Sequence, residues 1–295
     1  MRQNTIQKPV SIAGTGLHSG KTIHLKLLPA PCNHHIVFVR VDLPGKPCIP
    51  ACIHNLSSQM RCTALVHNKA KIHTTEHLLA TCFAMKLDNL VIEVDGPEIP
   101  GMDGSALPFY NMLKEAGIQE QEAQAEEIII TKEILLQKKA NPLWQKLLQA
   151  LKIGGKIHSS NIQVLPHPSG LKLEYFLDYS FSHIPKQNIA LEIEEDTFAK
   201  EIAPARTFAL QKEIGIGQKI LGLGKGTTSQ NTLIITDKGE ILDNTLRFPD
   251  ELARHKILDL LGDISLVGKR IHAHIIARYS GHSLNAALAK TVDSL

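Results

Sequence analysis

A histidine and an aspartate four residues apart are the first indication of metal chemistry. Segment 254–263 (RHKILDLLGD) contains His255 and Asp259, and on a helix this spacing places both side chains on one face. An imidazole nitrogen and a carboxylate oxygen are ligands that Zn²⁺ accepts at about 2 Å. Asp263 adds a polar group one turn further on. The pattern indicates either a metal-binding face or an ordinary solvated face.

A glutamate next to a histidine could complete such a site. Glu76 and His77 begin a segment of helical composition, so their side chains would point about 100° apart. His77 could bind a metal while Glu76 reaches a water on it, where a carboxylate can take a proton. The alternative is a glutamate that only interacts with the positive end of the helix dipole.

A third histidine, His282, lies in segment 280–285 (SGHSLN), a glycine turn after a predicted strand. An imidazole exposed there can act as a general acid or stabilise an oxyanion, although an exposed histidine without a role fits the same local sequence. Hydrolysis of an amide needs a nucleophile, relief of charge on the carbonyl oxygen and a proton for the amine. The three motifs together could supply all of these.

Three other patterns predict no site. The loop 14–22 (GTGLHSGKT) imitates a phosphate-binding loop, but that motif requires glycine where Thr15 stands. The metalloprotease pattern His-Glu-x-x-His is absent. Cys48 and Cys52 lack the second cysteine pair that would complete a tetrahedral metal site. The 5 cysteines are odd in number and lie in the first third of the chain, so we expect free thiols.

Composition excludes several classes of protein. A chain of 295 residues, 43% hydrophobic, can bury a sizeable core. A formal net charge of +3 without a basic run, and only 4% aromatic residues, argue against binding to nucleic acid. No apolar stretch reaches the roughly 18 residues of a transmembrane helix, and the N-terminus lacks a secretory signal. We expect a cytosolic monomer without a transmembrane segment.

The predicted elements that carry these motifs form two similar halves. In the first we predict a hairpin over 10–28, then strands and helices over 35–39, 62–66, 74–85 (helix), 90–94 and 107–116 (helix). In the second we predict 128–130, 141–151 (helix), 162–165, 171–179, 189–193, 233–236, 249–266 (helix) and 271–277. The polar stretch 115–127 marks the boundary between them. The sequence therefore predicts an α+β fold made of two two-layer α/β sandwich domains, 1–125 and 126–295.

Six blocks of the sequence carry a resemblance to a known family. They are GTGLHSGK (14–21), TTEHLLA (74–80), DNLVIEVDGPEIPGMDGSALPF (88–109), ARTF (205–208), LRFPDELARHKILDLLGD (246–263) and SGHSLN (280–285). In this order they resemble the zinc-dependent UDP-3-O-acyl-N-acetylglucosamine deacetylases of lipid A biosynthesis. The resemblance implies an active site between the two domains, and a small insert in each domain, near 41–66 and 209–242.

The resemblance also implies the roles of individual residues. Those that match the ligands of one catalytic zinc ion are His77, His255 and Asp259. Glu76 matches the general base, and His282 matches the general acid that stabilises the oxyanion. Thr207 matches a hydroxyl that hydrogen-bonds the tetrahedral intermediate, and Asp263 would orient His282. Residues that match substrate contacts or line the cleft or acyl channel are Lys256, Phe208, His18, Met60, Arg61, Cys62, Ile214, Ile216 and Leu223.

The implied reaction removes the N-acetyl group from UDP-3-O-(3-hydroxyacyl)-N-acetylglucosamine. Its products are acetate and UDP-3-O-acyl-glucosamine, in the committed step of lipid A biosynthesis of Gram-negative bacteria. Tyr279 stands where some relatives have a basic residue for the diphosphate, so Arg278 or Lys256 would take that task. We expect no dehydratase fused behind SGHSLN. Two alternatives stay open: a zinc amidase for another acylated sugar, and an inactive relative that only binds acyl or nucleotide-sugar ligands.

Overall fold

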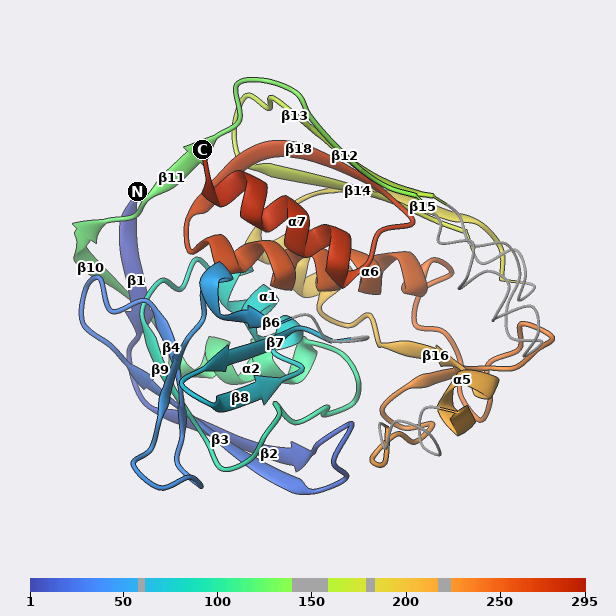
Figure 1. Ribbon diagram of the computed structural model, residues 1–295, viewed down its shortest axis with the longest axis horizontal. Coiled ribbons are helices and arrows are strands. Elements are labelled where there is room, and N and C mark those ends of the chain that lie inside the picture. Colours follow the sequence, from blue (N-terminus) through green and yellow to red (C-terminus); the bar gives the residue numbers. More distant parts are fainter. Residues whose placement is uncertain (58–61, 140–158, 179–183, 217–223) are drawn as a thin grey trace.

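The fold is built on two main sheets with the helices of both halves stacked between them (Figure 1). A computed structural model describes residues 1–57, 62–139, 159–178, 184–216 and 224–295, and the elements below come from these ranges. The helices of each half pack on their own sheet and meet those of the other half in the middle. The predicted α+β class, with two-layer sandwich units, is confirmed.

The first half contains a five-stranded sheet. Its strands, in spatial order, are β2 (Val10–Thr15), β3 (Thr22–Pro29), β9 (Leu90–Val94), β4 (Ile36–Arg40) and β5 (Cys48–Pro50). Alternate residues of β3 are buried, which is the pattern expected of a sheet with one covered face. Helices α1 (Glu76–Ala84) and α2 (Leu107–Ala116) lie on that side (Figure 1). Gly117, with φ of +72°, ends α2 in a conformation that favours glycine.

The second half repeats this arrangement with a six-stranded sheet. Its strands are β12 (Ile134–Lys138), β13 (Ser160–Leu165), β18 (Arg270–Arg278), β14 (Leu171–Leu177) and β15 (Gln187–Glu192), with β11 (Glu127–Ile129) parallel to β18. Helices α6 (Glu251–Ile264) and α7 (His282–Asp293) pack on this sheet. A short helix α4 (Glu195–Thr197) and a helical turn η3 (Phe198–Ile202) follow β15. In β18 the buried residues alternate with His272 and His274, which share the opposite face.

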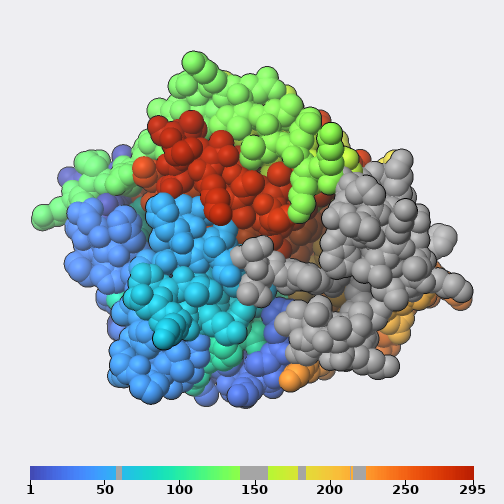
Figure 2. Space-filling view, viewed as in Figure 1, coloured from blue at the N-terminus to red at the C-terminus, as the bar shows by residue number. Residues whose placement is uncertain are grey.

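Each half carries a small sheet of its own. In the first half β6 (Leu56–Ser57), β7 (Ala64–His67) and β8 (Ala70–His73) form an antiparallel sheet after the turn η1 (Ile53–Asn55). This insert begins later than the predicted 41–66, because β5 belongs to the main sheet. In the second half β16 (Phe208–Leu210) pairs in parallel with β17 (Leu233–Ile235), and α5 (Gln211–Ile216) follows β16. Figure 2 shows the first insert, in light blue and cyan, directly beside the red C-terminal helix α7.

The polar stretch 115–127 is not an open linker. Most of it forms β10 (Ile118–Gln124), which pairs antiparallel with β1 (Arg2–Ile6) at the N-terminus. This strand could not be predicted from the sequence. Both of its faces are largely exposed, so its residues do not alternate between hydrophobic and polar. The domain boundary at 125 stays a prediction, and β11 begins at Glu127, shortly beyond it.

Two further predictions differ from the structure or fall outside it. Segment 280–285 was predicted as a turn, yet His282 is the first residue of helix α7, with Gly281 at the N-cap. The predicted helix over 141–151 lies outside the described residues. Within the described parts of the chain, no helix is long and apolar enough to cross a membrane.

Candidate metal and active site

Helices α1 and α6, from different halves, meet at a glycine. A Cβ atom built on Gly262 would lie 2.2 Å from the backbone oxygen of Glu76 and 2.6 Å from its Cα. Only glycine allows the first turn of α1 to approach α6 this closely. The contact brings Glu76 and His77 next to His255, Asp259 and Asp263, which α6 presents from successive turns.

Three side chains from these helices form a compact cluster suited to a metal ion. His77, His255 and Asp259 are buried, and their ligand atoms all lie within 4.8 Å of one another. Oδ1 of Asp259 is 3.4 Å from Nε2 of His255 and 3.9 Å from Nε2 of His77. Ligand atoms at about 2.0–2.1 Å from a tetrahedral ion lie roughly 3.4 Å apart, so the spacing fits a small divalent cation.

The protonation states of the cluster also suit a cation. Burial and the neighbouring His255 lower the pKa of His77 to about 3, and burial lowers the pKa of His255 as well. Burial acts to raise the pKa of Asp259, but Lys256 and His255 outweigh it, and the pKa of this carboxyl is lowered. Two neutral imidazoles and one carboxylate are therefore available as ligands.

A buried ion pair holds the backbone that orients His255. Nδ1 of His255 is 3.1 Å from the carbonyl oxygen of Ala205, to which it can donate, leaving Nε2 unprotonated for a metal. Next to Ala205, Arg206 donates from Nε to Glu251 at 2.8 Å, and Glu251 is the completely buried first residue of α6. The segment 205–208 is thereby fixed against α6.

Glu76 is a buried carboxylate with one well-defined hydrogen bond. The backbone N–H of Thr63 donates to Oε2 of Glu76 at 2.9 Å, and Glu76 is 3% exposed. Burial raises the pKa of Glu76 to about 7, although the charge of His282 opposes this shift. A carboxylate with that pKa can accept and release a proton near neutral pH. Carboxylate oxygens of Glu76 and Asp259 and a ring nitrogen of His282 also lie within 4.8 Å of one another.

His282 is held through its other ring nitrogen. Nδ1 of His282 donates to Oδ2 of Asp263 at 2.9 Å, and Nδ2 of Asn285 donates to the same oxygen at 2.8 Å. The hydroxyl of Thr63 donates to Oδ1 of Asp263. Burial acts against the imidazolium, but the carboxylates of Asp263, Asp259 and Glu76 outweigh it and raise the pKa of His282 to about 9. Near neutral pH, Nε2–H therefore remains to donate to a substrate.

Beside this array lies a cavity of about 200 Å³. Its lining includes Cys62, Thr63, Asp263 and His282. Burial and the charge of Glu76 raise the pKa of the Cys62 thiol to about 12, so the thiol remains protonated. Cys62 thus lies on the wall of this cavity, beside Asp263 and His282.

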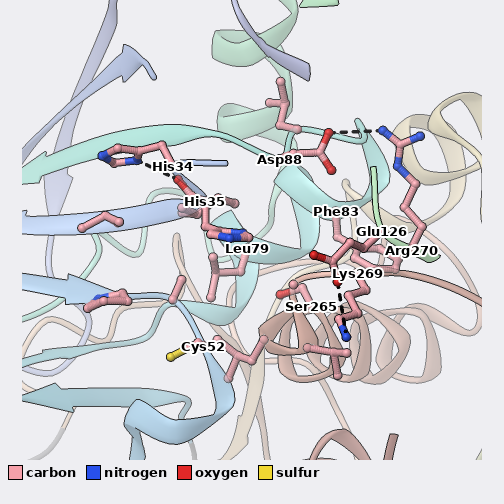
Figure 3. A pocket seen from close by; sticks show the side chains of 18 of the residues that line it. His34, His35, Cys52, Leu79, Phe83, Asp88, Glu126, Ser265, Lys269 and Arg270 are labelled. Carbon is pink, nitrogen blue, oxygen red and sulfur yellow. Dashed lines mark hydrogen bonds and ion pairs between the residues drawn. The ribbon is translucent and has the colours of Figure 1, made fainter. Parts of the chain in front are cut away.

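A larger cavity, of about 420 Å³, lies at the far end of α1 (Figure 3). Leu79 and Phe83 of α1 face it, and ion pairs join Asp88 to Arg270 and Glu126 to Lys269 around it. Its lining, as far as the chain is described, contains none of the residues predicted to do chemistry.

Residues predicted to contact the substrate or the reaction intermediate lie beside the cluster. The ring of Phe208 lies 6.3 Å from the ring of His255, centroid to centroid. Nζ of Lys256 is 2.6 Å from Oδ2 of Asp259. Thr207 is partly exposed, and its backbone N–H donates to Gly104 at 2.8 Å. Phe208 and Lys256 thus flank the cluster, and Thr207 adjoins Phe208.

His18 lies in the loop that imitates a phosphate-binding motif, and this loop already holds an anion. The backbone N–H groups of His18 and Ser19 donate to the carboxylate of Glu98 at 2.9 and 2.7 Å. Glu98 is 2% exposed. The two amide groups that a phosphate would need are occupied by the protein's own side chain.

The structure does not place every predicted substrate contact. Met60, Arg61 and Leu223 lie outside the described residues, as does the side chain of Ile216. Ile214 lies on α5, beyond β16 and partly buried. Arg278, a candidate for the diphosphate, places its guanidinium 4.7 Å above the ring of Phe176. Tyr279, which stands where some relatives have a basic residue, is 36% exposed with φ of +56°.

Sequence reasoning missed three residues that hold the site together. Thr63 contacts both Glu76 and Asp263, Asn285 contacts Asp263, and Arg206 anchors the segment beside His255. Asn285 and Arg206 belong to the motifs SGHSLN and ARTF, so their place in these blocks was an available signal. Thr63 had no signal beyond its position after Cys62.

Over nearly its whole length the chain is similar to proteins of one family. A family model described as UDP-3-O-acyl N-acetylglycosamine deacetylase matches residues 3–294. A protein of Myxococcus xanthus (strain DK1622) named UDP-3-O-acyl-N-acetylglucosamine deacetylase is 36% identical over 292 residues, which cover 99% of this chain and 86% of the relative. Proteins of the same name from Actinobacillus pleuropneumoniae serotype 3 (strain JL03) and Syntrophus aciditrophicus (strain SB) are 36% and 34% identical, over 99% and 98% of this chain and 90% and 85% of theirs. The chain therefore belongs to the UDP-3-O-acyl-N-acetylglucosamine deacetylase family.

Proposed function

We propose that this protein is a zinc-dependent deacetylase that removes the N-acetyl group from UDP-3-O-acyl-N-acetylglucosamine. The observation that carries the proposal is the joint placement of the His77, His255 and Asp259 cluster with Glu76 and His282 at the contact of α1 with α6. An inactive relative would have no need to keep an ordered base and acid beside a cation site. Cytosolic location and the monomeric state stay predictions.

The proposed zinc would be held by His77, His255 and Asp259. When bound, it supplies a Lewis acid that polarises the amide carbonyl and acidifies water. Glu76 takes the proton from the attacking water, and its raised pKa of about 7 suits this exchange at neutral pH. The N–H of Thr63 holds Oε2, and Oε1 would face the water.

His282 acts on the oxygen and nitrogen of the scissile amide. With Nδ1 bonded to Asp263, the imidazolium presents Nε2–H to the oxyanion and then donates this proton to the leaving amine. The Thr207 hydroxyl adds a hydrogen bond to the tetrahedral intermediate. Lys256 and Phe208, which flank the cluster, contact the sugar nucleotide, and Ile214 contacts the acyl chain. The products are acetate and the free 2-amino sugar nucleotide.

The direct test measures two quantities on the purified wild-type protein. We expect one zinc ion per chain by elemental analysis, and acetate released from UDP-3-O-acyl-N-acetylglucosamine. Stoichiometric zinc without acetate release would favour an amidase for another acylated sugar. A protein that cannot bind zinc at all would contradict the mechanism.

Loss of one predicted ligand should remove the metal. Asp259→Ala and His77→Ala should each weaken zinc binding by more than about 100-fold, because only two protein ligands remain. Substitution of residues that merely hydrogen-bond metal ligands already lowers metal affinity by about 10–100-fold. Competition with a chelating dye measures the affinity. His34→Ala, at a partly buried histidine outside the cluster, is the control and should bind zinc like the wild type. Unchanged zinc affinity in Asp259→Ala would refute the ligand assignment.

The rate of acetate release should depend on pH as a bell-shaped curve. It should rise as Glu76 loses its proton, at or below pH of about 7, and fall as His282 loses its proton, at or below pH of about 9. Both pKa values fall when a dication binds beside these groups, because positive charge favours their deprotonated forms. His282→Ala should lower kcat, retain zinc and abolish the alkaline limb. A variant that keeps this limb would exclude His282 as the acid.

A further inference from the structure

Thr63 contacts the two groups that must exchange protons with the substrate. Its backbone N–H donates to Glu76 at 2.9 Å, and its hydroxyl donates to Asp263, which in turn accepts from His282. Oγ1 of Thr63 is also 3.3 Å from Nδ1 of His282. Thr63 is 1% exposed and just precedes β7, in the small sheet of the first half. It therefore joins that insert to residues that α6 and α7 carry.

The hydrogen-bond inventory of Asp263 shows why this contact matters. Oδ2 accepts from His282 and Asn285, and the threonine hydroxyl is the donor to Oδ1. A hydroxyl carries one proton, so when Thr63 donates it to Asp263 the carboxylate is fixed as an acceptor. A carboxylate held in this way requires the proton of His282 to lie on Nδ1, and it fixes the plane of the imidazole ring.

We propose that Thr63 is a positioning residue that aligns the general base and the general acid with each other. This rests on the proposed function of Glu76 and His282. The backbone N–H orients Glu76, whereas the hydroxyl orients His282 through Asp263. A substitution of the side chain can therefore separate the two contacts, because every residue except proline retains the N–H.

Thr63→Val removes the hydroxyl at almost constant shape and leaves the N–H to Glu76. We expect kcat to fall about 10–100-fold, as for other residues that orient catalytic groups, with KM and zinc stoichiometry nearly unchanged. Thr63→Ser restores a hydroxyl and should remain within a few-fold of the wild type. The matched control is Thr5→Val, which removes a buried hydroxyl that bonds Asn89 and Ala30 far from the site, and should leave kcat unchanged.

A double variant tests the route through His282. In His282→Ala the acid is already missing, so adding Thr63→Val should lower kcat little further. The proposal is overturned if the fold-reductions of kcat in the two single variants multiply in full in the double variant. It is also overturned if Thr63→Val retains wild-type kcat. Thermal unfolding of each variant separates a rate effect from loss of the fold.

A spectroscopic measurement is independent of the substrate. The Nδ1–H proton of His282 should give a downfield NMR signal that is absent in His282→Ala and shifted in Thr63→Val but not in Thr5→Val. An unshifted signal would contradict the proposal. If the wild type releases no acetate while Thr63→Val moves this signal, the proposed function fails but the positioning contact stands.

Discussion

Glu76→Gln should lower kcat for acetate release by about 10³-fold while zinc stays bound, within the range of 10²–10⁴ for loss of general acid–base catalysis. Glutamine has nearly the same shape as glutamate, and its amide oxygen can still accept from the N–H of Thr63. What it lacks is a basic oxygen to take a proton from water. Of the described acidic groups nearby, Asp259 belongs to the candidate metal cluster and Asp263 already accepts hydrogen bonds from Thr63, His282 and Asn285, so we expect neither to replace it.

Steady-state kinetics and elemental analysis on the same preparation check this result. Glu93→Gln, a partly buried position on β9 outside the site, is the matched control and should retain wild-type kcat and zinc. If Glu76→Gln binds stoichiometric zinc and its kcat stays within tenfold of the wild type, Glu76 is not the general base.

Gly262→Ala should disable the enzyme although the new methyl group touches no substrate. Helix propensity alone favours alanine over glycine by about 1 kcal/mol. The methyl carbon, however, would lie 2.2 Å from the oxygen and 2.7 Å from the carbonyl carbon of Glu76, and backbone atoms cannot rotate away. Overpacking of this kind costs about 1–3 kcal/mol, so we expect the clash to prevail and the free energy of unfolding to fall.

The same substitution should lower kcat by about 100-fold, because moving α1 away from α6 shifts Glu76 and His77 relative to the other groups, and 1 Å of misplacement can have this effect. Urea unfolding and acetate release measure the two consequences. Gly281→Ala is the control, since a Cβ there meets nothing within 4 Å, and its stability should change by less than about 1 kcal/mol. If the Gly262→Ala protein is more stable than the wild type and equally active, the close contact of α1 with α6 is not needed for stability or for kcat.

The elements with strong local patterns could be predicted from the sequence. The apolar face of 107–116 predicts α2 to the residue, and the run of β-branched residues at 90–94 predicts β9. Elements that depend on distant partners were missed. Strand β10 is polar and pairs with β1, more than a hundred residues earlier. Strand β8 was also missed, although its neighbour β7 was predicted, because their hairpin turns at Asn68 and Lys69, both non-glycine residues with positive φ.

The candidate site divides in the same way. Histidine and carboxylate spacings on one helix, such as His255 and Asp259, can be read locally. Thr63 cannot, because a threonine near the start of a strand is ordinary until folding places it against Asp263, 200 residues away in the sequence. The resemblance of motifs predicted which residues do chemistry, whereas the packing of α1 on α6 through Gly262 shows what holds them in place.

The loop at residues 16–20 has a consequence for how anions encounter this protein. Glu98 is part of the same chain, so it competes for the amide groups of His18 and Ser19 at an effective concentration of about millimolar or more. Free phosphate would have to displace this tethered, buried carboxylate. The loop therefore has the form of an anion-binding site, but a carboxylate of the same chain occupies it and excludes dissolved anions. Its backbone instead joins the first half to Lys225 and Gly226 in the second.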